Sequence, residues 1–293
     1  MSEPLAPGDL SRRIADAFIA ACRDELDAPK PGNVHVFADG HRMTAQDFLY
    51  SAEAAAGPLT ENGAPVGTRI LAAVEATFAV VGSNTNLGIL LLCAPLAAAA
   101  ESQPHDLRAA LARVLHALDV EDAAAAFRAI ARASPAGLGE VEHHDVHATA
   151  TVTLRAAMAE AAGRDRIARQ YVTDFADVFD VGEPLLDAAL GALPDSRSAT
   201  LATFLGFLSA FPDSHICRKH GATAAERVRR QASWLRVRAL AAPRLDDVLP
   251  ELLAWDKELK DGGINPGTSA DLTVATLFVH RLRSVLPSGL NSA

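Results

Sequence analysis

Four polar segments carry the side chains of this chain that could do chemistry. The first reads Lys-Pro-Gly-Asn-Val-His over residues 30–35 and brings a cation, an amide and an imidazole together. Because Pro31 disfavours helical geometry at Lys30 and Gly32 permits a tight turn, the pattern predicts a rigid loop. Such a loop could hold a phosphate or a carboxylate. A helix end with solvated polar side chains explains the pattern equally well.

The second segment is Ser-Asn-Thr-Asn at residues 83–86, between two strongly apolar stretches. It directly precedes the most hydrophobic predicted helix, and the N-terminus of a helix offers free N–H groups to an anion. Its Asn and Thr side chains could also supply oxygen ligands to a metal. Helix capping needs only Asn84 or Thr85, so four polar residues in a row favour a functional role.

The third segment, residues 211–221, contains an Asp, two His, an Arg and a Lys within eight positions. Acids and bases at this density suit phosphate binding, Mg²⁺ coordination or proton transfer. A solvated turn between two helices is the plainer explanation. The apolar stretch that precedes residue 211 predicts that this turn lies against the core, which favours a functional role.

The fourth segment, residues 262–271, is rich in glycine and leads into a predicted helix capped by Thr268 or Ser269. Asp271 falls in the first turn of that helix, where the helix dipole favours an acid. The segment lacks the GxxxxGK[ST] pattern of a Walker A loop. It could be an ordinary cap, or it could face a nucleotide and hold Mg²⁺ through Asp271.

Composition limits the classes of protein to consider. The chain has 293 residues, 49% of them hydrophobic and 60 of them Ala, with a formal net charge of −9. That apolar content predicts a folded chain, and the acidic balance argues against nucleic acid or a membrane surface as a partner. The longest apolar stretch, residues 87–100, is too short to span a bilayer. Three widely spaced Cys predict neither a disulfide framework nor a zinc knuckle, so we expect a cytoplasmic protein.

Helix-period segments follow one another along nearly the whole chain, and no segment alternates with period two. Thr44 followed by Asp47 predicts a capped helix start, and Gly57-Pro58 predicts its end. The sequence therefore predicts an all-α fold of roughly a dozen helices in one compact domain over residues 1–293. The predicted helices are residues 10–26, 44–57, 68–81, 86–100, 106–118, 121–133, 149–162, 164–180, 184–193, 199–211, 222–240, 245–260 and 269–286.

Taken in order, the segments KPGNVH, NTNLG, PDSHICRKHG and NPGTSADL resemble the triphosphoribosyl-dephospho-CoA synthase family. The resemblance covers about residues 14–282. It implies an all-α protein that transfers a triphosphoribosyl group from ATP to an acceptor hydroxyl such as that of 3′-dephospho-CoA, with release of adenine. ATP as substrate, Mg²⁺ and small-molecule partners follow from the same resemblance, and a homodimer stays open.

One segment departs from the pattern of the citrate lyase enzymes in this family. Those enzymes usually carry Asn-Thr-His-Lys-Gly, whereas residues 84–88 here read Asn-Thr-Asn-Leu-Gly. The His and the Lys are therefore missing, and Leu87 stands where a Lys could bind phosphate. This form resembles a divergent branch found in archaea and methylotrophic bacteria, where such genes are associated with tetrahydromethanopterin-linked one-carbon metabolism.

The resemblance implies roles for residues of all four segments. The expected reaction is substitution at C1′ of the ATP ribose, which needs acid–base groups, a carboxylate for an oxocarbenium-like transition state and donors for the triphosphate. As catalytic residues we expect His215, Asp213, His35 and Glu53. As binding residues we expect Lys30, Asn33, Asn84, Thr85, Asn86, Arg218, Lys219, Asn265 and Ser269. As Mg²⁺ ligands we expect Asp213 and Asp271.

Three other functions stay open on the sequence. One is a ribosyl or phosphoribosyl transfer in another cofactor pathway, such as one related to pterins. Another is a nucleotide-binding protein without catalysis, since the missing Lys could mean lost transfer. The third is a helical interaction scaffold, although a scaffold has no need of the polar run at residues 83–86. Release of adenine from ATP would separate the enzymes from the other two.

Overall fold

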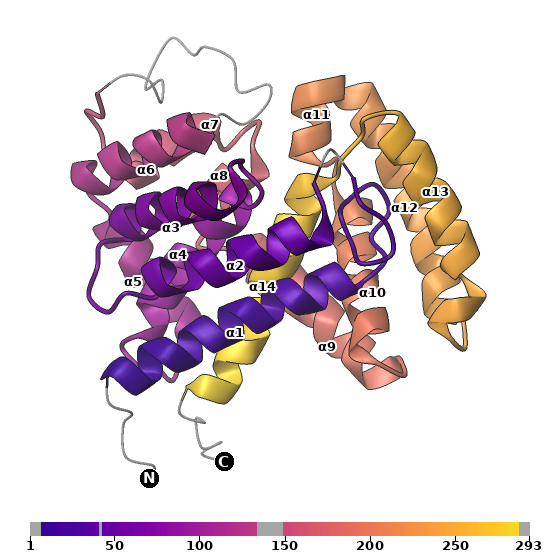
Figure 1. Cartoon of the computed structure of the whole chain (residues 1–293), viewed down its shortest axis with the longest axis horizontal. Coiled ribbons are helices and arrows are strands. Elements are labelled where there is room, and N and C mark those ends of the chain that lie inside the picture. Colours follow the sequence, from indigo (N-terminus) through magenta and orange to yellow (C-terminus); the bar gives the residue numbers. More distant parts are fainter. Residues whose placement is uncertain (1–6, 41–42, 134–148, 287–293) are drawn as a thin grey trace.

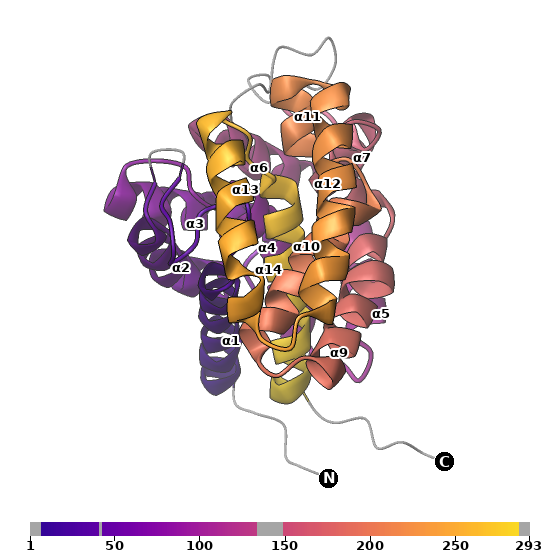
Figure 2. The same ribbon diagram turned by 90° about the vertical axis from the view of Figure 1, so that its right-hand side faces the viewer.

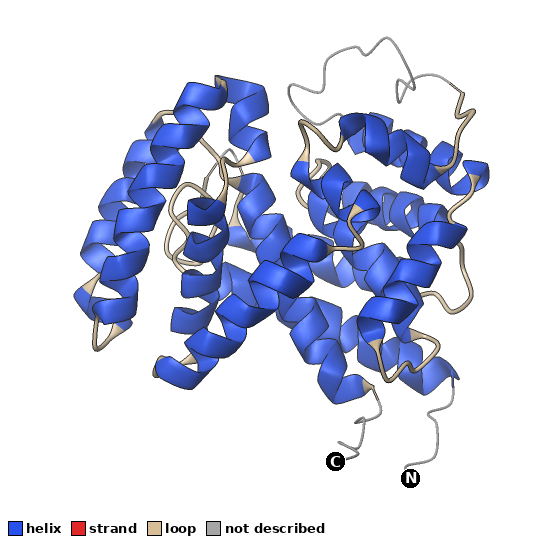
Figure 3. Ribbon diagram, turned by 180° about the vertical axis from the view of Figure 1, so that it is seen from behind, coloured by secondary structure: helices blue, strands red, loops and turns tan. Residues whose placement is uncertain are grey.

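The computed structural model describes residues 7–40, 43–133 and 149–286, and within these ranges it is helix and loop throughout (Figures 1 and 3). The all-α prediction is confirmed. The helices are α1 (Pro7–Asp27), α2 (Ala45–Leu59), α3 (Val66–Val81), α4 (Leu87–Ala100), α5 (Leu107–Ala117), α6 (Val120–Ala133), α7 (Leu154–Ala161), α8 (Arg166–Val172), π-helix η1 (Asp177–Gly182), α9 (Glu183–Ala192), α10 (Ser196–Ala210), α11 (Ser214–His220), α12 (Ala222–Ala241), 3₁₀-helix η2 (Leu245–Asp247), α13 (Leu249–Asp261) and α14 (Gly267–Val285).

Two apolar cores lie on either side of α10 and α14. The larger core joins α1 to α8 with α14, and α4 is buried nearly all round, as the sequence predicts. The smaller core joins α10 to α12 and α13, which form the outer layer in Figure 2. Helix α10 contributes to both cores because most of its residues are buried. The polar segments thus start or end on helices that are fixed by burial on both sides.

Helix α2 begins as predicted and ends later than predicted. Thr44 and Asp47 form a complete capping box. The helix continues through Pro58 to Leu59, however, so the predicted stop at Gly57-Pro58 is wrong by two residues. A Pro in the last turn is tolerated here because the N–H of Thr60 closes that turn on the carbonyls of Ala56 and Gly57.

The single helix predicted over residues 164–180 is two helices. Helix α8 ends at Val172, and positive φ angles at Asp174 and Phe175 separate it from the π-helix η1. The break brings Asp177 back onto α8, where its carboxylate accepts a bidentate pair of hydrogen bonds from Arg166. The sequence pattern could not show this break, because it depends on contacts between residues on both sides of it.

The segment at residues 211–221 is mostly helix rather than the predicted turn. Helix α11 starts after Asp213, whose carboxylate accepts hydrogen bonds from the N–H groups of His215 and Ile216. Asp213 is therefore a helix cap in addition to being part of a polar cluster. Gly221, with a φ of 84°, ends α11 and allows α12 to leave in a new direction.

Candidate functional site

The four polar segments meet around one cavity of about 480 Å³. This volume is in the range of ordinary small-molecule sites. Seven of the fourteen residues predicted as site residues line it. They are Asn33, Asn84, Thr85, His215, Arg218, Asn265 and Asp271. The amide of Asn33 donates a hydrogen bond of 2.8 Å to that of Asn265, so the first and fourth segments touch directly.

Four helices begin beside this cavity. The first residues of α4, α11 and α14 line it, and so does Asp165, the cap of α8. Helix N-termini carry partial positive charge and unpaired N–H groups, which attract anions. The caps of α8 and α11 use carboxylates, and Asp213 also accepts the N–H of Ser269 in α14. At the start of α4, the N–H of Leu87 is bound by the neutral amide of Asn84. The start of α4 is thus the better place for a phosphate.

Asp213 joins the starts of α11 and α14. One of its oxygens caps α11, and the other accepts the N–H and the hydroxyl of Ser269, each at 2.8 Å. The predicted cap of α14 by Thr268 or Ser269 is therefore wrong, because this helix begins at Gly267 and Asp213 takes its first donors. Burial raises the pKa of Asp213, and these hydrogen bonds oppose the rise. With four bonds made, Asp213 is a structural link and does not line the cavity.

Asp271 lies one turn into α14 and faces the cavity. Its side chain accepts no hydrogen bond from any residue that the structure describes. Burial holds its pKa well above the usual range, and the nearby charges of Asp213, Glu25 and Asp165 raise it further, while Arg218 opposes them. A carboxylate that is costly to ionise and has no internal donors is available to a ligand.

Two glycines allow this close packing. A Cβ at Gly88 would lie 2.0 Å from an oxygen of Asp271, and a Cβ at Gly267 would lie 2.6 Å from Nδ1 of His215. Gly88 thus lets the start of α4 approach the carboxylate directly, and Gly267 lets the imidazole lie on the start of α14. Both glycines belong to the segments singled out in the sequence.

The cationic side chains of the cavity are Arg164 and Arg218. Arg218 binds Asp165 at 3.0 Å across α11 and α8, and both side chains are about a quarter exposed. Arg164 precedes α8 and is largely exposed. Leu87 also lines the cavity at the place where the resemblance expects a Lys. Any phosphate here would therefore be neutralised by the two arginines rather than by the second segment.

Lys30 does not reach the cavity. Its ammonium is fully buried, donates to the carbonyls of Glu25 and Val34, and lies 3.2 Å from the Glu25 carboxylate. Burial lowers the pKa of Lys30 and raises that of Glu25. The ammonium therefore holds together residues 28–40, which we call the Lys30 loop, and it presents Glu25 to the cavity wall.

Helix α13 anchors the same loop from the other side. Asp256 accepts the N–H of Gly32 at 2.8 Å and the ammonium of Lys260 at 2.9 Å. The imidazole of His35 lies 3.3 Å from Asp256, and burial lowers its pKa. His35, predicted as an acid–base residue, is thus 1% exposed and lies behind the cavity wall. Its place in the structure is that of an anchor.

The remaining predicted residues lie outside the cavity for different reasons. Glu53 is on the exposed face of α2, paired with Arg23. Lys219 is exposed at the end of α11. Asn86 is buried beside Thr77, and Ser269 is bound to Asp213. The structure therefore brings none of these four side chains to the cavity.

Glu25, Arg164 and Asp165 line the cavity and were missed by the sequence reasoning. Arg164 and Asp165 stand in a run of charged residues, in which Asp165 and Arg169 have the i, i+4 spacing of an ordinary ion pair on a helix. Asp165 instead caps α8 and binds Arg218, which only the three-dimensional contact reveals. Glu25 ends a predicted amphipathic helix directly before the Lys30 loop, and a lone Glu there carries no signal of its own.

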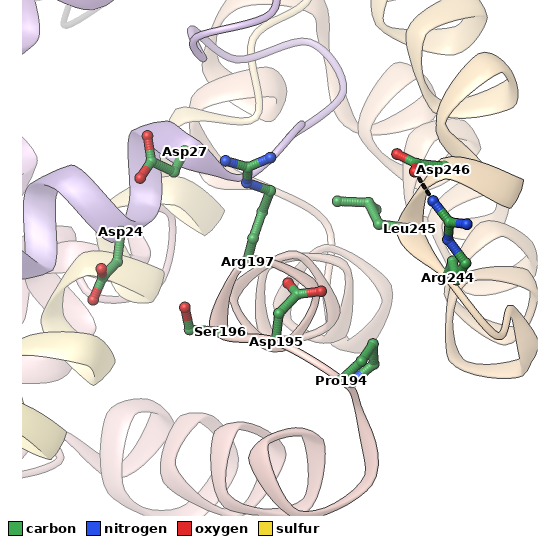
Figure 4. A pocket seen from close by; sticks show the side chains of 9 residues that line it. All are labelled: Asp24, Asp27, Pro194, Asp195, Ser196, Arg197, Arg244, Leu245 and Asp246. Atoms are coloured by element: carbon green, nitrogen blue, oxygen red, sulfur yellow. Dashed lines mark hydrogen bonds and ion pairs between the residues drawn. The ribbon is translucent and has the colours of Figure 1, made fainter.

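A second hollow lies beside the start of α10 (Figure 4). Most of its charged side chains already have a partner, and Asp27 is exposed. Asp24 binds Arg281, Asp195 caps α10, and Arg244 pairs with Asp246 at 2.6 Å. None of the four polar segments contributes to it. We therefore place the functional site in the first cavity.

Metal ligands are sparse in the described part of the chain. It holds no group of three or more His, Cys, Asp or Glu side chains placed to bind an ion. Of the two predicted ligands, Asp213 accepts hydrogen bonds with both oxygens, and Asp271 faces the cavity. One carboxylate still fits Mg²⁺, because that ion commonly keeps its waters and binds to proteins through substrate phosphates. Among the described helices, none is long and apolar enough to cross a membrane.

The structure is thus an all-α fold whose four polar segments line one cavity. Comparison with known proteins makes this specific. Residues 11–288 match the family described as ATP:dephospho-CoA triphosphoribosyl transferase (CitG), so the chain belongs to that family and is a transferase. The chain is also similar to a crystal structure from Archaeoglobus fulgidus, of a protein provisionally named triphosphoribosyl-dephospho-CoA synthase. The two are 25% identical with a TM-score of 0.63, over 79% of this chain and 96% of that one. A search of curated proteins found no significant match.

Proposed function

We propose that the cavity transfers the triphosphoribosyl group of ATP to a hydroxyl of 3′-dephospho-CoA and releases adenine. The family match favours this reaction over a pterin-related transfer and over nucleotide binding without catalysis. The observation that carries the proposal is Asp271, a carboxylate without internal donors at the meeting point of the four segments. A site that only held a nucleotide would have little use for such a costly group.

Two side chains supply the protons of the reaction. The bond from C1′ of the ribose to adenine breaks, and a bond from C1′ to the acceptor oxygen forms. His215 accepts the proton of the attacking hydroxyl, and Asp271 donates its proton to the departing adenine. As Asp271 becomes charged, it stabilises the positive charge that develops at C1′. The raised pKa of Asp271 supports this order, because it favours the protonated form that a proton donor needs.

The triphosphate is held by cations and by helix starts. Arg164 and Arg218 lie on the cavity, and Asn84 and Thr85 precede the start of α4. Asn33 and Asn265 bind the ribose or the acceptor through their linked amides. Mg²⁺ would arrive with the triphosphate and be held by the phosphate oxygens, where it would neutralise phosphate charge. The buried Lys30, His35 and Asp213 belong to the supporting structure in this proposal.

The direct test is incubation of the protein with ATP, Mg²⁺ and dephospho-CoA, followed by mass spectrometry for adenine and for the adduct. We expect one adenine for each adduct formed. Arg218→Gln should raise the KM for ATP by about tenfold, because it removes one charge-assisted contact. The matched control is Arg227→Gln on the exposed face of α12, which should leave the KM unchanged. ATP that stays intact with this acceptor would refute the proposed reaction.

A further inference from the structure

The cavity has two unlike sides. The polar segments form one side. Helices α6, α7 and α8 form the other, which we call the apolar wall, with Phe127, Ile130, Ala157, Met158 and Ala161 as its main residues. These three helices pack against one another, so their side chains form a continuous surface. Phe127 and Met158 are 5% and 8% exposed, and Ile130 and Ala157 are half-buried.

The triphosphate and the ribose of ATP do not explain this wall. They need N–H donors, hydroxyls and cations, which the polar side provides. The adenine of ATP could lie against part of an aliphatic and aromatic surface. Sites of this kind use apolar surface to bind the apolar part of a ligand and a few polar groups to orient it. An acceptor with a long apolar part of its own would use the rest of the wall.

Dephospho-CoA has such a part. Its adenosine diphosphate carries a long pantetheine arm with a geminal dimethyl group, methylene units, two amides and a thiol. Only the adenosine diphosphate portion holds the ribose hydroxyls that could attack C1′. The arm is chemically idle in the transfer, so contacts along it act on binding and on the choice of acceptor.

We propose that the apolar wall binds the pantetheine arm of the acceptor and thereby selects dephospho-CoA over shorter adenine nucleotides. This inference rests on the proposed function and adds to it the residues that determine specificity. Glu160, which lies beside the wall at the end of α7, gives an amide N–H of the arm its partner. The contacts along the wall would lower the KM for dephospho-CoA and leave kcat alone.

The experiment compares dephospho-CoA with ADP, which keeps the ribose hydroxyls and lacks the arm. The test variant is Ala157→Phe, which fills space in front of the wall. The matched control is Ala156→Phe, the next residue of α7, which is exposed and outside the cavity. Adenine release gives kcat and KM for each acceptor, calorimetry gives binding of each acceptor without ATP, and thermal melting confirms that both variants fold.

In the wild type we expect kcat/KM to be higher for dephospho-CoA than for ADP by roughly 10- to 100-fold, as for other apolar pockets. Ala157→Phe should reduce that preference at least about tenfold through KM, and Ala156→Phe should preserve it. A preference that is unchanged in Ala157→Phe, or lost equally in both variants, would overturn the inference. If no acceptor yields adenine, the proposed function fails, and calorimetry still decides the inference. If the wild type binds dephospho-CoA more tightly than ADP and Ala157→Phe abolishes that preference, the inference is supported. If the wild type binds the two acceptors equally, the inference is overturned.

Discussion

Asp213 and Asp271 are two aspartates from neighbouring segments with opposite surroundings. Asp213, at the start of α11, is buried and accepts four hydrogen bonds from two helices. Asp271, one turn into α14, accepts none from the described residues and faces the cavity. Burial raises the pKa of both, but only Asp213 has donors that offset the cost. The comparison separates an aspartate that stabilises the fold from one that the fold holds at a cost.

The same contrast holds between the Lys30 loop and the cavity. The charged groups of the loop are matched one against another: Lys30 with Glu25, and Asp256 with Lys260 and His35. The cavity instead holds Asp271, whose carboxyl group accepts no hydrogen bond from the residues that the structure describes. Matched groups make a rigid support, and a carboxyl group without such donors remains for the substrate. The same substitution of Asp by Asn should therefore have opposite effects on stability at Asp213 and at Asp271.

The largest effect is expected for Asp213→Asn. The amide keeps the size of the carboxylate but places an N–H₂ group against N–H donors at one helix start. We expect the free energy of unfolding to fall by about 3 kcal/mol. Urea denaturation followed by circular dichroism measures it. A variant as stable as the wild type would show that the link between α11 and α14 contributes little.

Asp271→Asn should do the reverse. It removes a carboxyl group that is costly to ionise and that accepts no hydrogen bond from the described residues, so we expect unchanged or higher stability. Adenine release should fall by roughly 100- to 1000-fold, because the variant can neither donate the proton nor stabilise the charge at C1′. Single-turnover assays measure adenine release, and melting curves of the same preparation measure stability. Activity within about threefold of the wild type would remove Asp271 from the mechanism.

The sequence predicted the fold and the segments better than it predicted the roles within them. Helix periodicity and the caps at Thr44 and Asp106 define elements locally, so most helices lie where they were expected. The four segments also meet around one cavity. Whether a polar residue in a segment faces the cavity or the core depends on partners far along the chain. Asp213 is bound by Ser269, 56 residues away, and Gly32 in the Lys30 loop is held by Asp256, 224 residues away.

The missed residues follow the same rule. Glu25 and Asp165 reach the cavity because other helices place them there, and no local spacing marks either one. The break after α8 was missed because Asp177 pairs with Arg166 only once the chain has turned back. The expectation of one domain stays a prediction. Local pattern thus predicts elements and the regions of function, and tertiary contacts decide which side chain acts.

Gly88→Ala tests the geometry of the cavity without changing any charged group. Its new Cβ would lie 2.0 Å from Oδ2 of Asp271, so the carboxylate must turn away. We expect stability to change little, because the end of a side chain can move, and adenine release to fall by roughly 10- to 100-fold. Gly191→Ala, on α9 with nothing within 4 Å of a new Cβ, is the matched control and should leave activity unchanged. Equal activity in the two variants would mean that the position of Asp271 is unimportant.

The smallest effect concerns pH and the anchor behind the cavity. Burial lowers the pKa of His35, the charges of Lys30 and Lys260 lower it further, and Asp256 opposes them. The unfolded chain therefore binds a proton near pH 6.5, where the folded chain does not, so stability present above pH 7 is lost as the pH falls below that value. The loss from this group can reach at most about 1.4 kcal/mol per pH unit. His35→Gln should flatten the decline in unfolding free energy between pH 7 and 5. An unchanged slope would mean that the imidazole of His35 is protonated in the folded protein, because Asp256 outweighs burial. The Lys30 loop would then be anchored by an ion pair between His35 and Asp256.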